Sequence, residues 1–143
     1  MFNGAVLVAD GATGTNYQRM GIEPGVAPEE WVFDEPAKVQ ELHRQFVEAG
    51  AQLVLTCTFG DSSLRLADER LAGRGPELNR RAVELAREAV GDGVLVAGSI
   101  GPTGHLADPL GPLTHELAVA TFSEQAAALS AGGADLLVLE TFF

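Results

Sequence analysis

The strongest constraint on the fold is a regular alternation of short apolar runs with longer segments of helical periodicity. Four runs rich in apolar and β-branched residues are expected to be strands: residues 5–9, 52–56, 94–97 and 135–139. Their hydrophobicity is nearly continuous, which is typical of strands buried on both faces of a parallel sheet. Three segments with apolar residues at three- and four-residue spacing are expected to be helices: residues 36–49, 76–90 and 114–131. The alternating order predicts an α/β fold.

Turn-forming residues mark the ends of the expected helices. Asp34 followed by Pro36 predicts the start of the first helix, and Gly50 predicts its end. The connections from helix to strand are short, whereas the segments after the strands are longer and rich in Gly, Pro, Thr and Asp. That asymmetry is typical of a β/α barrel, in which ligands bind at the carboxyl ends of the strands.

The length of the chain fits about half of such a barrel. A complete barrel takes about 250 residues and one strand with its helix about 30, so 143 residues accommodate roughly four units. A hydrophobic content of 46% allows a sizeable core, and no linker or low-complexity tract divides the chain. We therefore expect a single partial (β/α)8 TIM barrel with about the first four β/α units.

Composition and charge exclude several kinds of partner. Twenty acidic residues against nine basic ones give a formal charge of −11, which repels phosphate backbones and anionic lipid surfaces. The single cysteine, Cys57, cannot form an intrachain disulfide and fits a reducing compartment. The N-terminus has no basic region typical of a signal sequence, and no apolar stretch approaches 18 residues. We expect a cytoplasmic protein without nucleic-acid or membrane partners.

The loop after the first expected strand combines glycines with a carboxylate. Asp10 would stand at the carboxyl end of that strand, and Gly11 and Gly14 let the backbone turn sharply after it. In a barrel this position faces the ligand side. The same pattern also fits a carboxylate that caps the following segment, so the loop alone leaves both interpretations open.

The second expected strand ends in two hydroxyls and an aromatic ring. Thr56 and Thr58 should point to the same side, because alternate strand residues do. Phe59 fits the core as well as a pocket wall. Cys57 between them is predicted to be a small buried hydrophobic residue and not a nucleophile or a metal ligand.

A second carboxylate, Glu140, follows the fourth expected strand. Parallel strands end at the same edge of a sheet, so Asp10 and Glu140 should converge there. Two converging carboxylates form a site for a cation such as an ammonium group. The histidines lack the spacing of a metal site, and we interpret them as structural.

Four sequence blocks, in this order and spacing, resemble the homocysteine S-methyltransferase family: DGATGT at 10–15, LHRQFVEAGAQLVLTCTFG at 42–60, GSIGPTG at 98–104 and ADLLVLETF at 134–142. Four blocks in register are more specific than any one of them. The resemblance covers nearly the whole chain but only the N-terminal half of the family's domain. It implies that residues 1–143 are the N-terminal part of a homocysteine-binding domain, truncated after the fourth strand.

The resemblance also implies a reaction and a set of site residues. Members of this family are β/α barrels in which zinc, held by three cysteines, binds homocysteine as a thiolate that attacks a methyl donor and forms methionine. By position, Asp10 and Glu140 correspond to the carboxylates that hold the amino-acid end of homocysteine. Thr56 and Phe59 correspond to residues that line the same pocket.

Two features depart from the family pattern. Cys57 stands where many relatives have asparagine, and the zinc ligands of the family come from later strands. With one cysteine and no ligand cluster, the chain alone is expected to bind no metal and to be inactive by itself.

The residues of this chain leave the substrates partly open. Betaine, S-methylmethionine and a folate–cobalamin system all fit as the methyl donor, and selenocysteine fits as the acceptor in place of homocysteine. A competing interpretation is a non-catalytic half-barrel that self-associates to bury its open edges and binds a small amino acid through Asp10 and Glu140.

Overall fold

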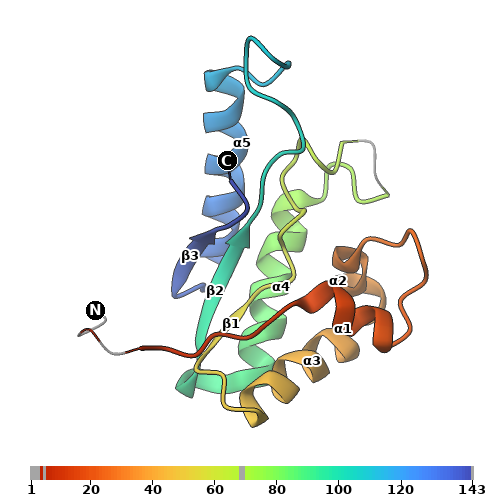
Figure 1. The fold of residues 1–143 in the computed structure, drawn as a ribbon, viewed down its shortest axis with the longest axis vertical. Helices are drawn as coiled ribbons and strands as arrows, with labels where there is room; N and C mark the ends of the chain where they lie inside the picture. Colours follow the sequence, from red (N-terminus) through yellow and green to blue (C-terminus); the bar gives the residue numbers. More distant parts are fainter. Residues whose placement is uncertain (1–3, 5, 68–69, 143) are drawn as a thin grey trace.

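A parallel sheet forms the centre of the structure, a computed structural model that describes residue 4, residues 6–67 and residues 70–142. The strands follow the order β1-β2-β3 (Figure 1) and comprise Leu53–Leu55, Leu95–Ile100 and Leu136–Leu139. Each strand overlaps one of the predicted runs, and β2 extends three residues beyond its run. The α/β class with a parallel sheet is therefore confirmed.

Three long helices confirm the expected helices to within one residue at their ends: α3 (Pro36–Glu48), α4 (Gly75–Val90) and α5 (His115–Ala131). The middle helix, α4, packs against both α3 and α5, and all three contact the sheet (Figure 1). Amphipathic spacing explains this position, because Leu78, Ala82 and Leu85 of α4 are all buried.

Helices α5 and α3 begin in two different ways. Thr114 caps α5, where its hydroxyl accepts a hydrogen bond from the Leu117 backbone N–H at 3.2 Å. The predicted start of the first long helix at Pro36 is confirmed, but Asp34 takes no part in it, because Asp34 ends a short helix, α2 (Trp31–Asp34). Glu35 precedes α3 without a side-chain cap bond, and Pro36 opens the helix because its fixed φ suits the first helical position.

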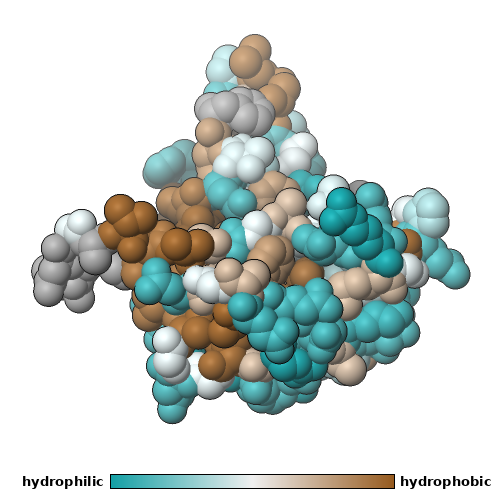
Figure 2. All heavy atoms as spheres, turned by 60° about the horizontal axis from the view of Figure 1, so that its bottom comes forward, coloured by the Kyte–Doolittle hydropathy of each residue, from teal (hydrophilic) through white to brown (hydrophobic). Residues whose placement is uncertain are grey.

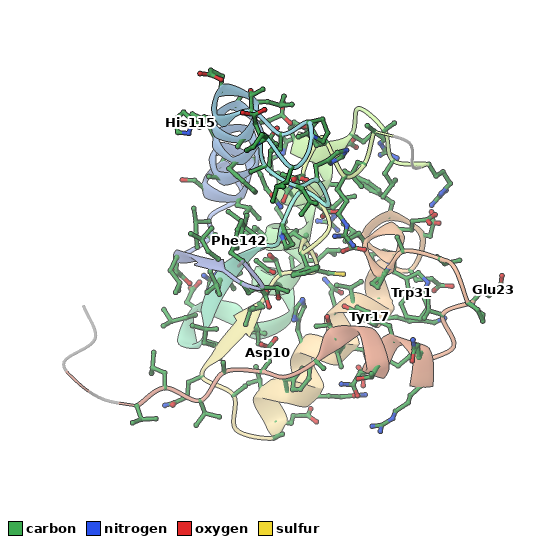
Figure 3. All side chains as sticks on the ribbon, turned by 45° about the horizontal axis from the view of Figure 1, so that its top comes forward. Asp10, Tyr17, Glu23, Trp31, His115 and Phe142 are labelled. Carbon is green, nitrogen blue, oxygen red and sulfur yellow. The ribbon has the colours of Figure 1, made fainter. Side chains whose placement is uncertain are left out.

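The sequence did not predict α1 (Thr13–Arg19) or two turns of 3₁₀ helix, η1 (Pro28–Glu30) and η2 (Gly91–Gly93). Such short elements contain too few residues to show a helical period. They nevertheless contribute to the core, because α1 and α2 bring the rings of Tyr17 and Trp31 to a centroid distance of 5.3 Å (Figure 3).

The predicted strand at residues 5–9 is wrong in extent. Ala5 lies outside the described residues, and of the rest only Ala9 forms a bridge, with Leu53 of β1. The Gln52 backbone N–H donates to the Val8 carbonyl at 2.8 Å, so this segment runs alongside β1. Val8 is 55% exposed, because in the described part of the chain no strand pairs with the other edge of the segment.

The prediction that the strands are buried on both faces is also wrong for β3. Leu137 and Leu139 are 41% and 69% exposed, whereas β2 is buried from Val96 to Ile100. The difference follows from neighbours, because β2 is paired on both sides and β3 on one side within the described residues. Figure 2 shows that apolar surface also gathers beside the N-terminal segment, while mainly hydrophilic side chains cover the opposite side of that view.

Two buried clusters support the sheet from the helix side. One joins α1, α2 and α3 to α4 and includes Tyr17 and Leu42, and the other joins the sheet to α4 and α5 and includes Val54 and Leu129. Helix α4 contributes to both and so links the two halves of the core. Among the described helices, none combines the length and the apolar character needed to cross a membrane.

Candidate functional site

The carboxyl ends of the strands open onto a pocket of about 520 Å³. The loop after the N-terminal segment, the ends of β1 and β2, and the residue after β3 line it. All four residues expected to contact a ligand lie on its wall: Asp10, Thr56, Phe59 and Glu140. The tertiary structure therefore brings side chains from both ends of the chain into one cavity.

Asp10 lies where the N-terminal segment ends beside β1 (Figure 3). Its Oδ2 accepts a hydrogen bond from the Leu55 backbone N–H at 3.0 Å. Its Oδ1 is buried and has no hydrogen-bond partner among the described residues. Asp10 does not cap α1, because Ala12 occupies the cap position and makes no side-chain cap bond. The carboxylate thus has one anchored oxygen and one unpaired oxygen.

Glu140 has the same arrangement at the end of β3. Its backbone N–H donates to the Ile100 carbonyl at 3.1 Å, which holds the residue beside the end of β2. The Ser99 hydroxyl donates to Oε1 of Glu140. Within the described part of the chain, Oε2 accepts no hydrogen bond. One oxygen of each carboxylate therefore stays available to a ligand.

The electrostatics of this pair favour a bound cation. Burial raises the pKa of Asp10 to about 6, because the ionised form loses solvation. The Leu55 N–H acts in the opposite direction, while the negative charge of Glu140 raises this pKa further. No basic side chain of the described residues forms an ion pair with either carboxylate. A ligand cation would relieve their repulsion.

The hydroxyl of Thr56 is used by the protein itself. Thr58 Oγ1 donates to the Ser99 carbonyl at 2.7 Å, so in the 2.6 Å contact between the two threonine hydroxyls Thr56 is the donor. Thr56 Oγ1 in turn accepts from the Ser99 backbone N–H at 3.0 Å. The expected shared side of Thr56 and Thr58 is confirmed. Thr56 lines the pocket, but its proton is not free to reach a ligand.

Phe59 forms a half-buried wall of the pocket. Its ring packs so closely on Gly101 that a Cβ there would come within 2.6 Å of the ring carbons, which explains a glycine at this position. The Arg65 guanidinium also lies over the Phe59 ring, 5.7 Å from its centroid. Arg65 is the only basic side chain among the described residues that line the pocket.

Sequence reasoning missed two polar residues of the site. Ser99 lies inside the block GSIGPTG, which the sequence analysis used only for the family resemblance, without assigning a role to the serine hydroxyl. Glu29 lies in η1, and its Oε1 accepts a hydrogen bond from the Gly60 backbone N–H at 2.9 Å. Glu29 and Gly60 are neighbours only in the folded chain, and they do not belong to a common periodic pattern. The spacing of residues in the sequence therefore could not identify Glu29 as part of the site.

The residues present do not fit a zinc site of three cysteines. Cys57 is 5% exposed, as expected of a small buried residue, and burial raises the pKa of its thiol, which disfavours the thiolate. No group of three His, Cys, Asp or Glu side chains that could hold a metal occurs among the described residues. His43 is buried within α3, and His115 lies at the far end of α5 (Figure 3).

Fold and pocket together define a parallel α/β domain with an acidic pocket at the carboxyl ends of its strands. The chain belongs to the homocysteine S-methyltransferase family, whose model matches residues 7–143. This match confirms the resemblance carried by the four sequence blocks.

Relatives and solved structures agree with this assignment. The chain is 31% identical to betaine–homocysteine S-methyltransferase 1 of Danio rerio, over 97% of this chain and 35% of that protein. It is also 31% identical to methionine synthase of Mycobacterium leprae, over 95% of this chain and 12% of that protein.

The metallated form of the homocysteine methyltransferase MmuM from Escherichia coli superposes with a TM-score of 0.82 at 26% identity, covering 96% of this chain and 54% of that one. Its apo form gives a TM-score of 0.70. The chain therefore spans about half of this structure and about a third of the Danio rerio relative.

Proposed function

We propose that this chain is the N-terminal part of a homocysteine S-methyltransferase barrel, and that it binds the amino-acid end of homocysteine. Asp10 and Glu140 receive the substrate ammonium group. The observation that carries this proposal is that each carboxylate lines one pocket with one oxygen anchored and one oxygen unpaired. An ammonium group has three donors and one positive charge, so it complements two such oxygens.

Charge supports the choice of ligand. Among the described residues, three carboxylates line the pocket, those of Asp10, Glu29 and Glu140, against the single guanidinium of Arg65. Such a wall repels phosphates and favours a zwitterion bound through its cationic end. Thr56 contributes by holding the Ser99 main chain at the edge of the pocket, and Phe59 contributes an apolar wall for the methylene chain of homocysteine.

The proposed reaction transfers a methyl group to the thiol of homocysteine and forms methionine. Two of the matched proteins are named for homocysteine, one from Danio rerio and one from Escherichia coli, which supports homocysteine as the acceptor. In the proposed enzyme, zinc is held by residues outside this chain, because Cys57 and its surroundings do not fit the metal. This chain contributes binding and orientation of the acceptor and is proposed to be inactive alone.

Calorimetric titration with three ligands tests the ammonium site. L-Homocysteine should bind, 3-mercaptopropylamine, which lacks only the carboxylate, should bind more weakly, and 4-mercaptobutyrate, which lacks only the amino group, should not bind. Asp10→Asn and Glu140→Gln should each weaken homocysteine binding by about thirtyfold or more, because each deprives the ammonium of one partly buried charge partner. The exposed Asp92→Asn is the matched control. Equal binding of 4-mercaptobutyrate and homocysteine would refute the proposal.

A second candidate, the self-associating half-barrel without catalytic activity, is favoured by one observation. Large apolar side chains are exposed at both edges of the sheet, with Val6 at 89% on one edge and Leu139 at 69% on the other. Two copies related by a twofold axis could bury both edges at once. Sedimentation velocity distinguishes the candidates: a stable dimer that Leu139→Lys dissociates supports self-association, and a monomer at high concentration rejects it.

A further inference from the structure

We propose that Ser99 is a positioning residue that holds the Glu140 carboxylate in place for the substrate ammonium group, an inference that rests on the proposed function. The Ser99 hydroxyl donates to Oε1 of Glu140 across the ends of β2 and β3. Ser99 lines the pocket yet is only 2% exposed, so its side chain has little freedom to turn elsewhere. Its effect on a ligand passes through Glu140.

The main chain of Ser99 is fixed by two hydroxyls of the neighbouring segment. Its N–H donates to Thr56 Oγ1 at 3.0 Å, and its carbonyl accepts from Thr58 Oγ1 at 2.7 Å. The two threonine hydroxyls bond each other at 2.6 Å, which closes a ring of hydrogen bonds. With both backbone polar groups held by this ring, the direction of the Ser99 hydroxyl toward Glu140 is set by the end of β1.

A buried amide network extends this support to the helices. The side-chain amide of Gln125 on α5 donates to the Thr58 carbonyl at 3.0 Å and to Asn79 Oδ1 at 3.2 Å. Asn79 on α4 donates to the Asp61 carbonyl at 3.0 Å. All these groups are buried, where hydrogen bonds are well protected from water. The segment after β1, which fixes Ser99 and through it Glu140, is therefore supported by two helices as well as by the sheet.

Glu140 needs such support more than Asp10 does. It lies just beyond the last residue of β3 and is followed by Thr141, whose φ of 64° ends the extended backbone, and in the described chain nothing pairs with the outer edge of β3. A glutamate has three side-chain torsions, and an unanchored one samples several rotamers. Asp10 is held by a backbone N–H, from Leu55, whereas Glu140 is held by a side chain that a mutation can remove.

A double-mutant cycle tests this role. Ser99→Ala should weaken homocysteine binding about tenfold, because a hydrogen bond to a charged group is lost. In the Glu140→Gln background the same change should have little further effect, since the carboxylate that Ser99 positions is already gone. Ser99→Cys, nearly equal in size and a weak donor, should behave like Ser99→Ala and guards against a folding defect. Ser62→Ala, another buried serine that does not contact Glu140, is the matched control.

The outcomes separate this inference from the proposed function. If the wild-type chain binds homocysteine, and Glu140→Gln weakens binding while Ser99→Ala and Ser99→Cys do not, the positioning role is refuted and the ammonium site stands. If Ser99→Ala weakens binding equally in both backgrounds, its effect is structural and the role is again refuted. If the wild-type chain binds no homocysteine, the proposed function fails, and the inference fails with it.

Discussion

Two aspartates at opposite ends of the parallel strands have similar backbone contacts and opposite electrostatics. At the amino end of β3, Asp135 Oδ2 accepts a hydrogen bond from the Val96 backbone N–H at 2.8 Å and pairs with the Arg87 guanidinium. At the carboxyl end of the N-terminal segment, Asp10 Oδ2 accepts from the Leu55 N–H at 3.0 Å, but no basic side chain of the described residues pairs with it. The same bond from a neighbouring strand therefore serves two different purposes.

The pKa values of the two groups show what the cation changes. The pKa of Asp135 lies below its usual value, because the Val96 N–H and the Arg87 charge both favour the ionised form. The pKa of Asp10 rises to about 6, because burial and Glu140 outweigh the Leu55 N–H. At one end the protein completes the ion pair and gains stability, and at the other no described basic side chain completes it, which is where we propose that the ligand ammonium binds.

The largest expected effect on binding comes from placing a positively charged side chain beside Asp10. Glu140→Lys should weaken homocysteine binding more than about a hundredfold, because the lysine neutralises Asp10 and repels the substrate ammonium group. Glu140→Gln, which removes the charge without inverting it, should lose less. Calorimetric titration of both variants measures the difference. Equal losses would mean that the rim does not select its ligand by charge.

Removing the Arg87 guanidinium, at the amino end of β3, should lower the stability of the fold. Arg87→Ala breaks the pair with Asp135 and two bonds to the Gly91 and Val94 carbonyls, at 2.8 and 2.9 Å. We expect the free energy of unfolding to fall by about 2 kcal/mol, with homocysteine binding unchanged. Urea denaturation measures this change. Arg44→Ala, which removes an exposed pair with Glu41, is the control and should lower stability much less.

Binding should depend on pH through Asp10. With a pKa of about 6, Asp10 is mostly ionised at pH 7 and mostly protonated at pH 5. Homocysteine keeps its ammonium group throughout this range, so its affinity should fall about tenfold from pH 7 to pH 5. Titrations across this range measure the slope, and Asp10→Asn should abolish it. A flat profile in the wild-type chain would contradict ionisation of Asp10 as a condition for binding.

The smallest effect expected is a gain in stability when Asp10 loses its charge. Because the folded-state pKa of Asp10 is raised, ionising it destabilises the fold as pH rises from about 4 to about 6, and that penalty persists above pH 6. Asp10→Asn should therefore raise the free energy of unfolding at pH 7.5 by about 1 kcal/mol, after allowing for solvent screening, and by much less at pH 4.5. Urea denaturation at both pH values checks the sign, and a loss of stability at pH 7.5 would contradict it.

Elements with a long repeating pattern were predictable from the sequence, and short ones were not. The three long helices show their period over several turns, and three of the four predicted strands form at their continuous apolar runs. The segment 5–9 has the same pattern but forms only a bridge at Ala9, because a strand also needs partners on its edges. Helix α1 and η1, which bring Tyr17 and Glu29 into place, are too short to reveal a period.

By itself, the sequence determined the order of strands and helices and the acidic residues that follow the first and last apolar runs. Because parallel strands end at one edge of a sheet, that order was enough to predict that Asp10 and Glu140 share a pocket. Only the tertiary structure decided how each is held. Asp10 is held by the Leu55 N–H and Glu140 by the Ser99 hydroxyl, and no basic side chain of the described residues pairs with either carboxylate. These contacts join residues distant in the chain, so they depend on how the strand ends pack and not on any local pattern.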